Sequence, residues 1–189
     1  DYTSKHLPDS HWTVMRSGWK PTDRYLILNH GPIAGHAHRE ALAFTCYAFG
    51  EPHALELDLA VELGYDDPKC DFTRSSRSHN MLVLDDECVE RTHNPIDLWT
   101  GQDVVWHTDE HIDYFQAYHR GYQRTKNAIV TRTILFIKPH FWLVHDRVTL
   151  QKSSTAKTAS FYLHACNPFE PRATDWTSTG NKSRLDVIP

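Results

Sequence analysis

The chain has 189 residues, of which 40% are hydrophobic and 12% aromatic, enough for one large β domain or two small domains with a substantial core. Its formal net charge is −4 with neutral histidines, and no basic block stands out, which argues against nucleic acid as a partner. The sequence has no apolar run of about eighteen residues and no signal-peptide pattern, so it predicts no membrane-spanning helix. Its cysteines have no CxxC spacing, which argues against a zinc ribbon and leaves a disulfide open; they are Cys46, Cys70, Cys88 and Cys166.

The first predicted strands cover Tyr25–Leu28 and His38–Phe49. The second begins at the last residue of the motif Gly35-His36-Ala37-His38. A His-x-His pair on a strand points both imidazoles to one face, with Cβ atoms roughly 7 Å apart, because strand side chains alternate with period two. Both histidines can then line one pocket, or one can bind a metal while the other faces a substrate. An isolated pair of this kind is more often two solvated surface histidines.

The next predicted strand, Leu55–Leu63, alternates strictly between aliphatic and other residues. Glu56, Asp58 and Glu62 share its polar face. Such a face is commonly the solvated outer face of an antiparallel sheet. If the face instead contributes a metal ligand, Glu56 and Asp58 compete for that role.

Two further candidates follow this strand. Tyr65 lies in a predicted loop, where a tyrosine can act as a general acid or base if its pKa is lowered, although a tyrosine that caps a core edge is commoner. His79 ends a polar turn just before the predicted strand Met81–Leu84, so its side chain is well placed to enter a site or to make a turn hydrogen bond. Two histidines and a carboxylate with one open position form a typical zinc shell.

The rest of the chain also has the periodicity of strands. Ile129–Ile137 and Phe141–Val148, separated by a short turn that contains Pro139, predict a hairpin, and Ser160–Ala165 predicts another strand. Only Asp109–Tyr118 has a weak helical tendency. Many strands separated by turn residues indicate an all-β fold, an antiparallel sandwich or barrel.

Several segments, in the same order along the chain, resemble the C-terminal β-sandwich portion of heparinase II/III-like polysaccharide lyases, a family that includes oligoalginate lyases. The resemblance covers roughly residues 8 to 165, and the pairing of a GHxH motif with an RxHN motif is its most specific part. The matching segments are Val14–Trp19, Gly35–His38, Ala48–Pro52, Arg74–Asn80, His119–Tyr122 and Trp142–Arg147.

The resemblance implies one structural zinc ion, with His38, Glu56 and His79 as its ligands. His38 and His79 match the two metal-binding histidines of the family. Glu56 matches a ligand that is usually Asp in the family, and this departure keeps Asp58 as a competitor.

The resemblance also implies roles on the substrate side. Tyr65 matches the active-site tyrosine, and His36 matches a residue that lines the substrate site. Arg77 could meet an acidic sugar through a forked hydrogen-bond pair, although a surface arginine in a turn is an equally good interpretation.

The implied reaction is β-elimination in a uronic-acid polysaccharide of the heparan or alginate type, at a periplasmic or secreted location. In the family an α/α toroid precedes the sandwich and supplies further catalytic residues. We therefore expect residues 1–189 to form a single β-sandwich domain, a fragment of a larger lyase whose toroid is the partner of this domain. The isolated chain is expected to be an incomplete enzyme.

Two other functions are compatible with the residues. A cupin-like metalloenzyme also carries HxH, Glu and His on strands, but its Glu normally follows a few residues after the second His, whereas Glu40 is only two residues on. A non-catalytic sandwich that binds or scaffolds carbohydrate would use exposed Trp side chains as stacking platforms, and this interpretation weakens if most of the six Trp are buried.

Overall fold

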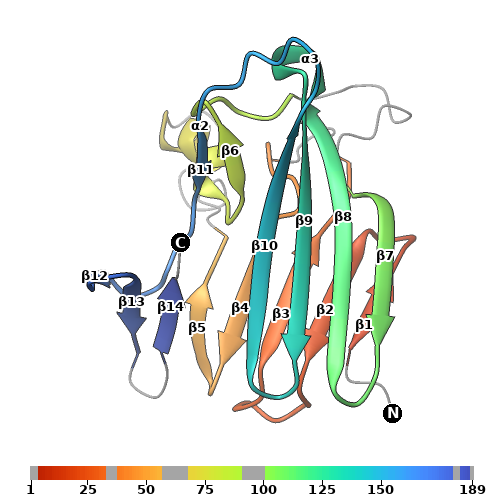
Figure 1. The fold of residues 1–189 in the computed structure, drawn as a ribbon. Helices are drawn as coiled ribbons and strands as arrows, with labels where there is room; N and C mark the ends of the chain where they lie inside the picture. The colour runs from red at the N-terminus through yellow and green to blue at the C-terminus, as the bar shows by residue number, and fades with distance from the viewer. Residues whose placement is uncertain (1–3, 33–37, 57–67, 91–100, 181–183, 188–189) are drawn as a thin grey trace.

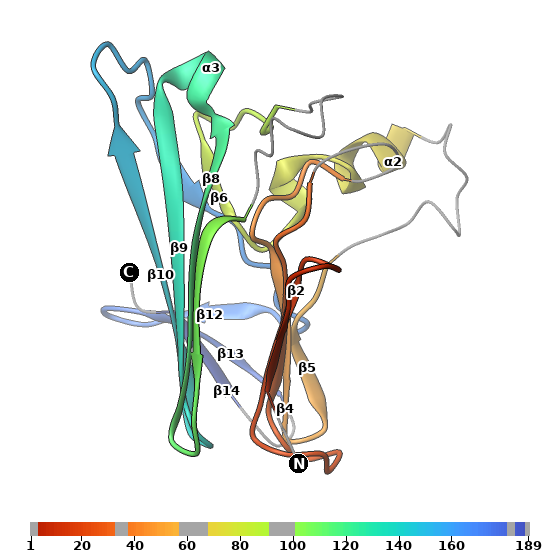
Figure 2. The ribbon, with the colours of Figure 1, turned by 90° about the vertical axis from the view of Figure 1, so that its right-hand side faces the viewer.

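A computed structural model describes residues 4–32, 38–56, 68–90, 101–180 and 184–187. Two antiparallel sheets face each other and form a β-sandwich (Figures 1 and 2). The first sheet has the order β1-β2-β3-β4-β5, with bounds Lys5–Leu7, Trp12–Arg16, Tyr25–Asn29, Phe44–Ala48 and Glu51–Ala54. The second has the order β10-β9-β8-β7, with bounds Phe141–Leu150, Ala128–Ile137, Ile112–Tyr122 and Gln102–Thr108.

Smaller elements lie at the ends of this sandwich. A two-stranded sheet pairs β6 (Leu82–Leu84) with β11 (Ala159–Phe161), close to helix α2 (Pro68–Thr73) and a 3-10 turn over Ser76–Ser78 (Figure 1). Helix α3 (Gln123–Lys126) joins β8 to β9. A three-stranded sheet follows near the C-terminus, formed by β12 (Phe169–Pro171), β13 (Trp176–Thr179) and β14 (Arg184–Val187).

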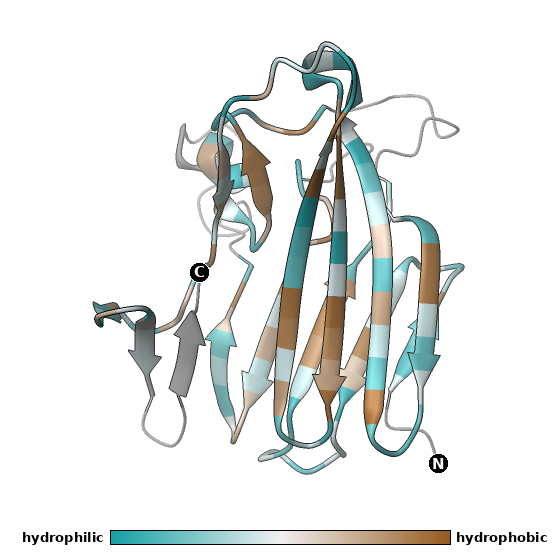
Figure 3. Cartoon of the chain, viewed as in Figure 1, coloured by the Kyte–Doolittle hydropathy of each residue, from teal (hydrophilic) through white to brown (hydrophobic). Residues whose placement is uncertain are grey.

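The inward faces of the two large sheets meet in one hydrophobic core. Met15, Leu26 and Leu28 from the first sheet pack in a cluster with Phe115 and Phe136 from the second. Hydrophobic and hydrophilic residues alternate along β8, shown as brown and teal bands in Figure 3. This period-two pattern explains why each strand buries one face and solvates the other.

The predicted hairpin is confirmed, since β9 and β10 pair antiparallel over their whole length. The weak helical tendency of Asp109–Tyr118 was wrong, because these residues enter β8. Every second residue of β8 is buried, beginning with Asp113, Phe115 and Ala117. That burial fits a strand and would scatter around a helix.

One other predicted strand was too long, and a second lies mostly outside the described residues. The strand predicted from His38 begins only at Phe44, and Leu42 before it has a positive φ of 57°, a conformation that extended backbone does not adopt. Of the strand predicted over 55–63, Leu55 and Glu56 are described. They follow the end of β5 and are not part of a strand. Residues 57–63 of that prediction lie outside the described part of the chain.

Cys46, Cys88 and Cys166 are free thiols, so no disulfide joins the cysteines whose side chains the structure describes. Burial raises the pKa of the Cys46 thiol to about 12, which keeps it protonated and unreactive. In the described ranges, no helix is both long and apolar enough to cross a membrane.

Candidate metal centre

Three potential ligands converge beyond the ends of β4 and β5. Glu40, Glu56 and His79 each offer one donor atom, and these atoms all lie within 4.8 Å of one another. His79 Nδ1 contacts Glu56 Oε2 and lies 3.6 Å from Glu40 Oε2. The His79 side chain is 1% exposed, whereas the two carboxylates are 22% and 23% exposed, so the cluster opens toward solvent on the carboxylate side.

The two carboxylates are oriented in the same way. Glu40 Oε1 accepts a hydrogen bond from Asn29 Nδ2 at 2.9 Å, and Glu56 Oε1 accepts one from the Asn80 backbone N–H at 2.9 Å. Each acid therefore uses one oxygen to fix its position and turns the other toward His79. Hydrogen bonds that hold a ligand in this manner are typical of metal centres.

His38 lies against the same cluster. Its ring centroid is 5.1 Å from that of His79, with the planes tilted by 46°. The predicted ligands His38, Glu56 and His79 are thus brought together, although His38 comes from a segment outside the strands. Glu40 joins them from the same segment, two residues further along.

The electrostatics of the cluster favour a bound cation. Burial raises the pKa of Glu40, and the negative charge of Glu56 raises it further, while His79 and the hydrogen bond from Asn29 act in the opposite direction. Within the described residues, no lysine or arginine forms an ion pair with Glu40 or Glu56. Two neighbouring carboxylates beside an imidazole, with no such cation, match the donor chemistry of zinc and other divalent first-row metals.

Asn80 fixes the peptide that carries His79. Its side-chain amide donates to the backbone carbonyls of Phe44 and Leu55, and its Oδ1 accepts from the His164 N–H at 2.7 Å. Asn80 is fully buried. One side chain therefore ties the His79 segment to β4, to the segment of Glu56 and to the chain after β11.

A buried ion pair supports the centre from the second sheet. Arg132, on β9, makes two hydrogen bonds with Asp146 on β10, at 2.8 and 2.7 Å. The Nη1 atom of Arg132 donates to the carbonyls of Leu42 and Asn80, at 2.5 and 2.8 Å. The guanidinium thus connects the sandwich to both segments that carry ligands, since Leu42 follows Glu40 and Asn80 follows His79.

Sequence reasoning missed Glu40, Asn80 and Arg132. Glu40 was considered only against cupin spacing, although a strand from His38 would place Glu40 on the same face as His38, two residues earlier. For Arg132 a signal exists, because it falls in phase with the buried face of β9, between Val130 and Ile134. A charged residue at a core position predicts a buried partner.

The remaining predicted site residues divide into two groups. His36, Tyr65 and the competing ligand Asp58 lie outside the residues that the structure describes. Arg77 lies in the 3-10 turn before His79 and is exposed, and its backbone carbonyl is held by His164 Nε2 at 2.9 Å.

The comparisons with known proteins point to one family. The family model "Heparinase II/III-like, C-terminal" matches residues 1–183. Two structures of the BT4657 gene product, a heparinase III, one of them with methylated lysines, superpose with TM-scores of 0.78 and 0.77 at 15% identity over 100% of this chain. Another heparinase III structure superposes with a TM-score of 0.72 at 13% identity over 91% of this chain.

The chain spans only 32%, 33% and 27% of the length of these three structures. None of the curated proteins matches it. The similarity to the solved structures shows that the chain has their sandwich fold. The family model covers nearly the whole sequence. The chain therefore belongs to the heparinase II/III-like C-terminal family.

Proposed function

We propose that this chain is the β-sandwich part of a polysaccharide lyase that cleaves uronic-acid polysaccharides by β-elimination, at a periplasmic or secreted location. The observation that carries the proposal is the cluster of Glu40, Glu56 and His79, with the His38 ring against it, in a member of this family. Family membership favours this function over the cupin-like alternative.

The residues of the cluster fit one zinc ion. His38, Glu40, Glu56 and His79 would supply two nitrogens and two carboxylate oxygens, and four protein ligands are typical of a closed structural site. Such an ion would join the His38–Glu40 segment to the two other segments that carry ligands. Its role would be to hold these segments in place beside the substrate.

The chemistry of β-elimination assigns roles to the predicted substrate-side residues. The proton at C5 of the uronate is acidified by the adjacent carboxylate, and a base removes it as the C4–O bond breaks and a C4=C5 double bond forms. His36 and Tyr65 are the proposed proton carriers, with Tyr65 protonating the leaving oxygen. Arg77 would pair with the substrate carboxylate, on which negative charge develops.

The test is a screen of the longest natural polypeptide that contains this chain against heparan-type and alginate polysaccharides. Elimination creates an unsaturated uronate, whose new double bond absorbs in the ultraviolet. We expect this absorbance with at least one uronate substrate, and its loss in Tyr65→Phe with the melting temperature unchanged. Absorbance at the wild-type rate in Tyr65→Phe would remove that residue from the mechanism, and no absorbance with any uronate would contradict the proposed function.

A further inference from the structure

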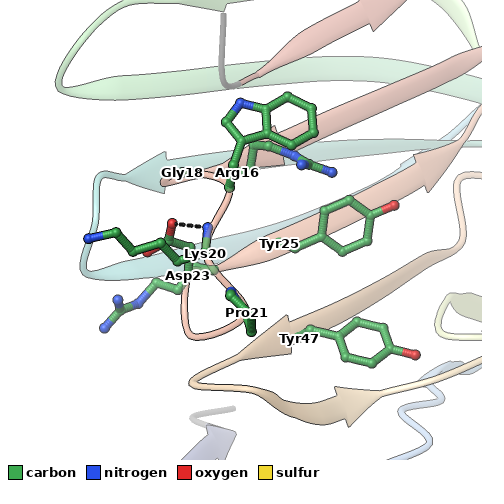
Figure 4. Close-up of a pocket in the computed structure, with 9 residues that line it drawn as sticks. Arg16, Gly18, Lys20, Pro21, Asp23, Tyr25 and Tyr47 are labelled. Carbon is green, nitrogen blue, oxygen red and sulfur yellow. Dashed lines mark hydrogen bonds between the residues drawn. The ribbon is translucent and has the colours of Figure 1, made fainter.

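A pocket of about 340 Å³ lies at the turn between β2 and β3, at the end of the sandwich away from α2 (Figures 1 and 4). This volume is in the range of small-ligand sites. None of the residues of the metal centre lines it. Its principal side chains are Arg16, Trp19, Lys20, Arg24, Tyr25 and Tyr47.

Three strands build the floor of the pocket in register. Arg16 on β2 pairs with Tyr25 on β3, which pairs with Tyr47 on β4. The Tyr25 and Tyr47 rings lie 6.2 Å apart between centroids and stand side by side on neighbouring strands in Figure 4. They belong to the outer face of the sheet, because the alternate residues Met15, Leu26 and Cys46 face the core.

The Arg16 guanidinium lies close to two aromatic rings. It lies 4.0 Å from the ring centre of Trp19 and 4.8 Å from that of Tyr25. Arg16 Nε is buried without a hydrogen-bond partner in the described chain. A stacked guanidinium still presents its N–H groups at the edge, in the fork geometry that matches a carboxylate or a sulfate.

The aromatic side chains of the pocket are unusually accessible. Trp19 is 71% exposed and Tyr47 is 39% exposed. An exposed tryptophan beside a pocket offers a flat apolar surface, and the C–H face of a sugar ring packs on such a surface. The pocket therefore combines a stacking platform with a fork of donors.

The charge of the pocket opposes that of the chain. Arg16, Lys20 and Arg24 line it together with one acid, Asp23, in a protein of net charge −4. Asp23 Oδ2 already accepts the Lys20 backbone N–H at 2.7 Å. A Cβ at Gly18 would lie 2.2 Å from that same oxygen, so a larger residue there would have to displace the Asp23 carboxylate. Three cationic side chains against one acid give the pocket a net positive charge, which favours an anionic ligand.

We propose that this pocket binds an anionic hexuronate oligosaccharide, at a second site separate from the metal centre. The choice of hexuronate rests on the proposed function, whereas the stacking and the positive charge rest on the pocket alone. The Arg16 guanidinium would pair with a carboxylate or sulfate of the sugar, and Trp19 would stack on the ring. Such a site would hold a polysaccharide chain at the end of the sandwich remote from the proposed reaction.

The test compares binding of the protein to size-matched oligosaccharides of alginate, which carry carboxylates only, of heparan sulfate, which also carry sulfates, and of neutral dextran. Arg16→Gln and Trp19→Ala are each expected to weaken binding of the anionic sugars about tenfold or more, which is 1.4 kcal/mol or more of binding free energy. Arg120→Gln is the matched control, because Arg120 also stacks on a tyrosine, Tyr118, but outside the pocket. Tighter binding of heparan sulfate than of alginate would assign sulfate as the preferred anion, and equal binding would assign the carboxylate.

The proposal is overturned if both pocket variants bind the anionic sugars like wild type, or if dextran binds equally well. Hydroxyl-radical footprinting of the complete polypeptide gives an independent readout. Trp19 should be oxidised without sugar and protected by the anionic oligosaccharide, and protection without sugar would mean that another part of the protein covers the pocket. Elimination of short uronate substrates, measured in parallel, separates the two proposals, since it persists if only the pocket assignment fails.

Discussion

At the scale of single residues, the candidate centre depends on how Glu40, Glu56 and His79 use their donor atoms. Each of the two glutamates accepts a hydrogen bond from a protein N–H with one carboxylate oxygen and points the other oxygen toward His79. This arrangement makes Glu40 more than a neighbour of the predicted ligand Glu56. It also predicts that substitutions of the acids and of the histidines have distinguishable effects on zinc binding.

Removing one candidate ligand at a time should lower zinc affinity, by an amount that depends on the ligand removed. His38→Ala and His79→Ala should each lose bound zinc and lower the melting temperature, because each removes a nitrogen ligand. Glu40→Gln should weaken zinc binding about tenfold or more, by removing an anionic oxygen while keeping the hydrogen bond from Asn29. Elemental analysis and zinc titration followed by melting temperature measure both effects.

Glu110→Gln is the control for these variants, since that side chain is 84% exposed and remote from the cluster. It should bind zinc like wild type. Unchanged zinc content in His79→Ala would refute the ligand assignment, and unchanged affinity in Glu40→Gln alone would return the shell to His38, Glu56 and His79.

At the scale of elements, Arg132 on β9 and Asp146 on β10 hold the segments that carry Glu40 and His79 in place. Arg132 is 2% exposed and Asp146 is 8% exposed, so their ion pair is nearly free of solvent. Removing one partner leaves the other charge buried and uncompensated. The same change also frees the carbonyls of Leu42 and Asn80 from the Arg132 Nη1 donor.

Arg132→Met should therefore lower the free energy of unfolding by about 3–5 kcal/mol, and weaken zinc binding as well. The double variant Arg132→Met/Asp146→Leu should recover part of the stability, because no unpaired charge is then buried, but it should not recover the metal affinity. Urea denaturation and zinc titration distinguish the two effects. Full recovery of zinc affinity in the double variant would contradict the bracing role.

The elements also show what a sequence can and cannot predict. The run of β-branched residues over Ile129–Ile137 and the turn at Pro139 made the β9–β10 hairpin predictable, since strand propensity and turn chemistry are local properties of the sequence. The start of β4 could not be predicted from the sequence, because Leu42 adopts a left-handed backbone conformation that is uncommon for leucine. The place of Glu40 among the other candidate ligands depends on tertiary contacts, such as the hydrogen bond that it accepts from Asn29.

The site residues divide in the same way. His38, Glu56 and His79 could be selected from motif order, and the structure brings these three together. Tyr25 and Tyr47, by contrast, are neighbours only through the register of β3 and β4. Register between strands depends on the whole sheet, which is why the pocket at the β2–β3 turn could not be predicted from its parts.

At the scale of the whole molecule, buried histidines link stability to pH. Burial lowers the pKa of His119 to about 3, with a smaller contribution from the charge of Arg132. Burial likewise lowers the pKa of His30 to about 4, and His6 and His11 lower it further. Both rings are neutral in the fold but take up a proton near pH 6.5 when the chain unfolds, so they stabilise the fold above that pH and lose this contribution as the pH falls toward 4.

The free energy of unfolding should fall below pH 6.5 by up to about 1.4 kcal/mol per pH unit for each histidine. Urea denaturation at several pH values, with a chelator present to exclude metal effects, measures this slope. His119→Gln should show a shallower slope than wild type. His111→Gln is the matched control, since that ring is 80% exposed and should leave the slope unchanged. An equal slope in wild type and His119→Gln would contradict the linkage.

The whole molecule also determines how the sandwich contributes to chemistry. It spans about a third of the length of two of the heparinase III structures that it matches. Its described part carries the candidate metal centre and the positive pocket at opposite ends. In the proposed lyase, the first end holds the residues beside the reacting sugar. The second would hold the polysaccharide chain.

The most direct test of this account is the mass of the products formed from a defined uronate oligosaccharide by the complete polypeptide. Elimination divides the substrate without adding water, so the product masses should sum to the mass of the substrate, with one product carrying an unsaturated uronate at its new non-reducing end. Products whose masses sum to the substrate plus one water would show hydrolysis and contradict the account. Tight binding of the intact oligosaccharide with no cleavage would contradict it in favour of a carbohydrate-binding sandwich.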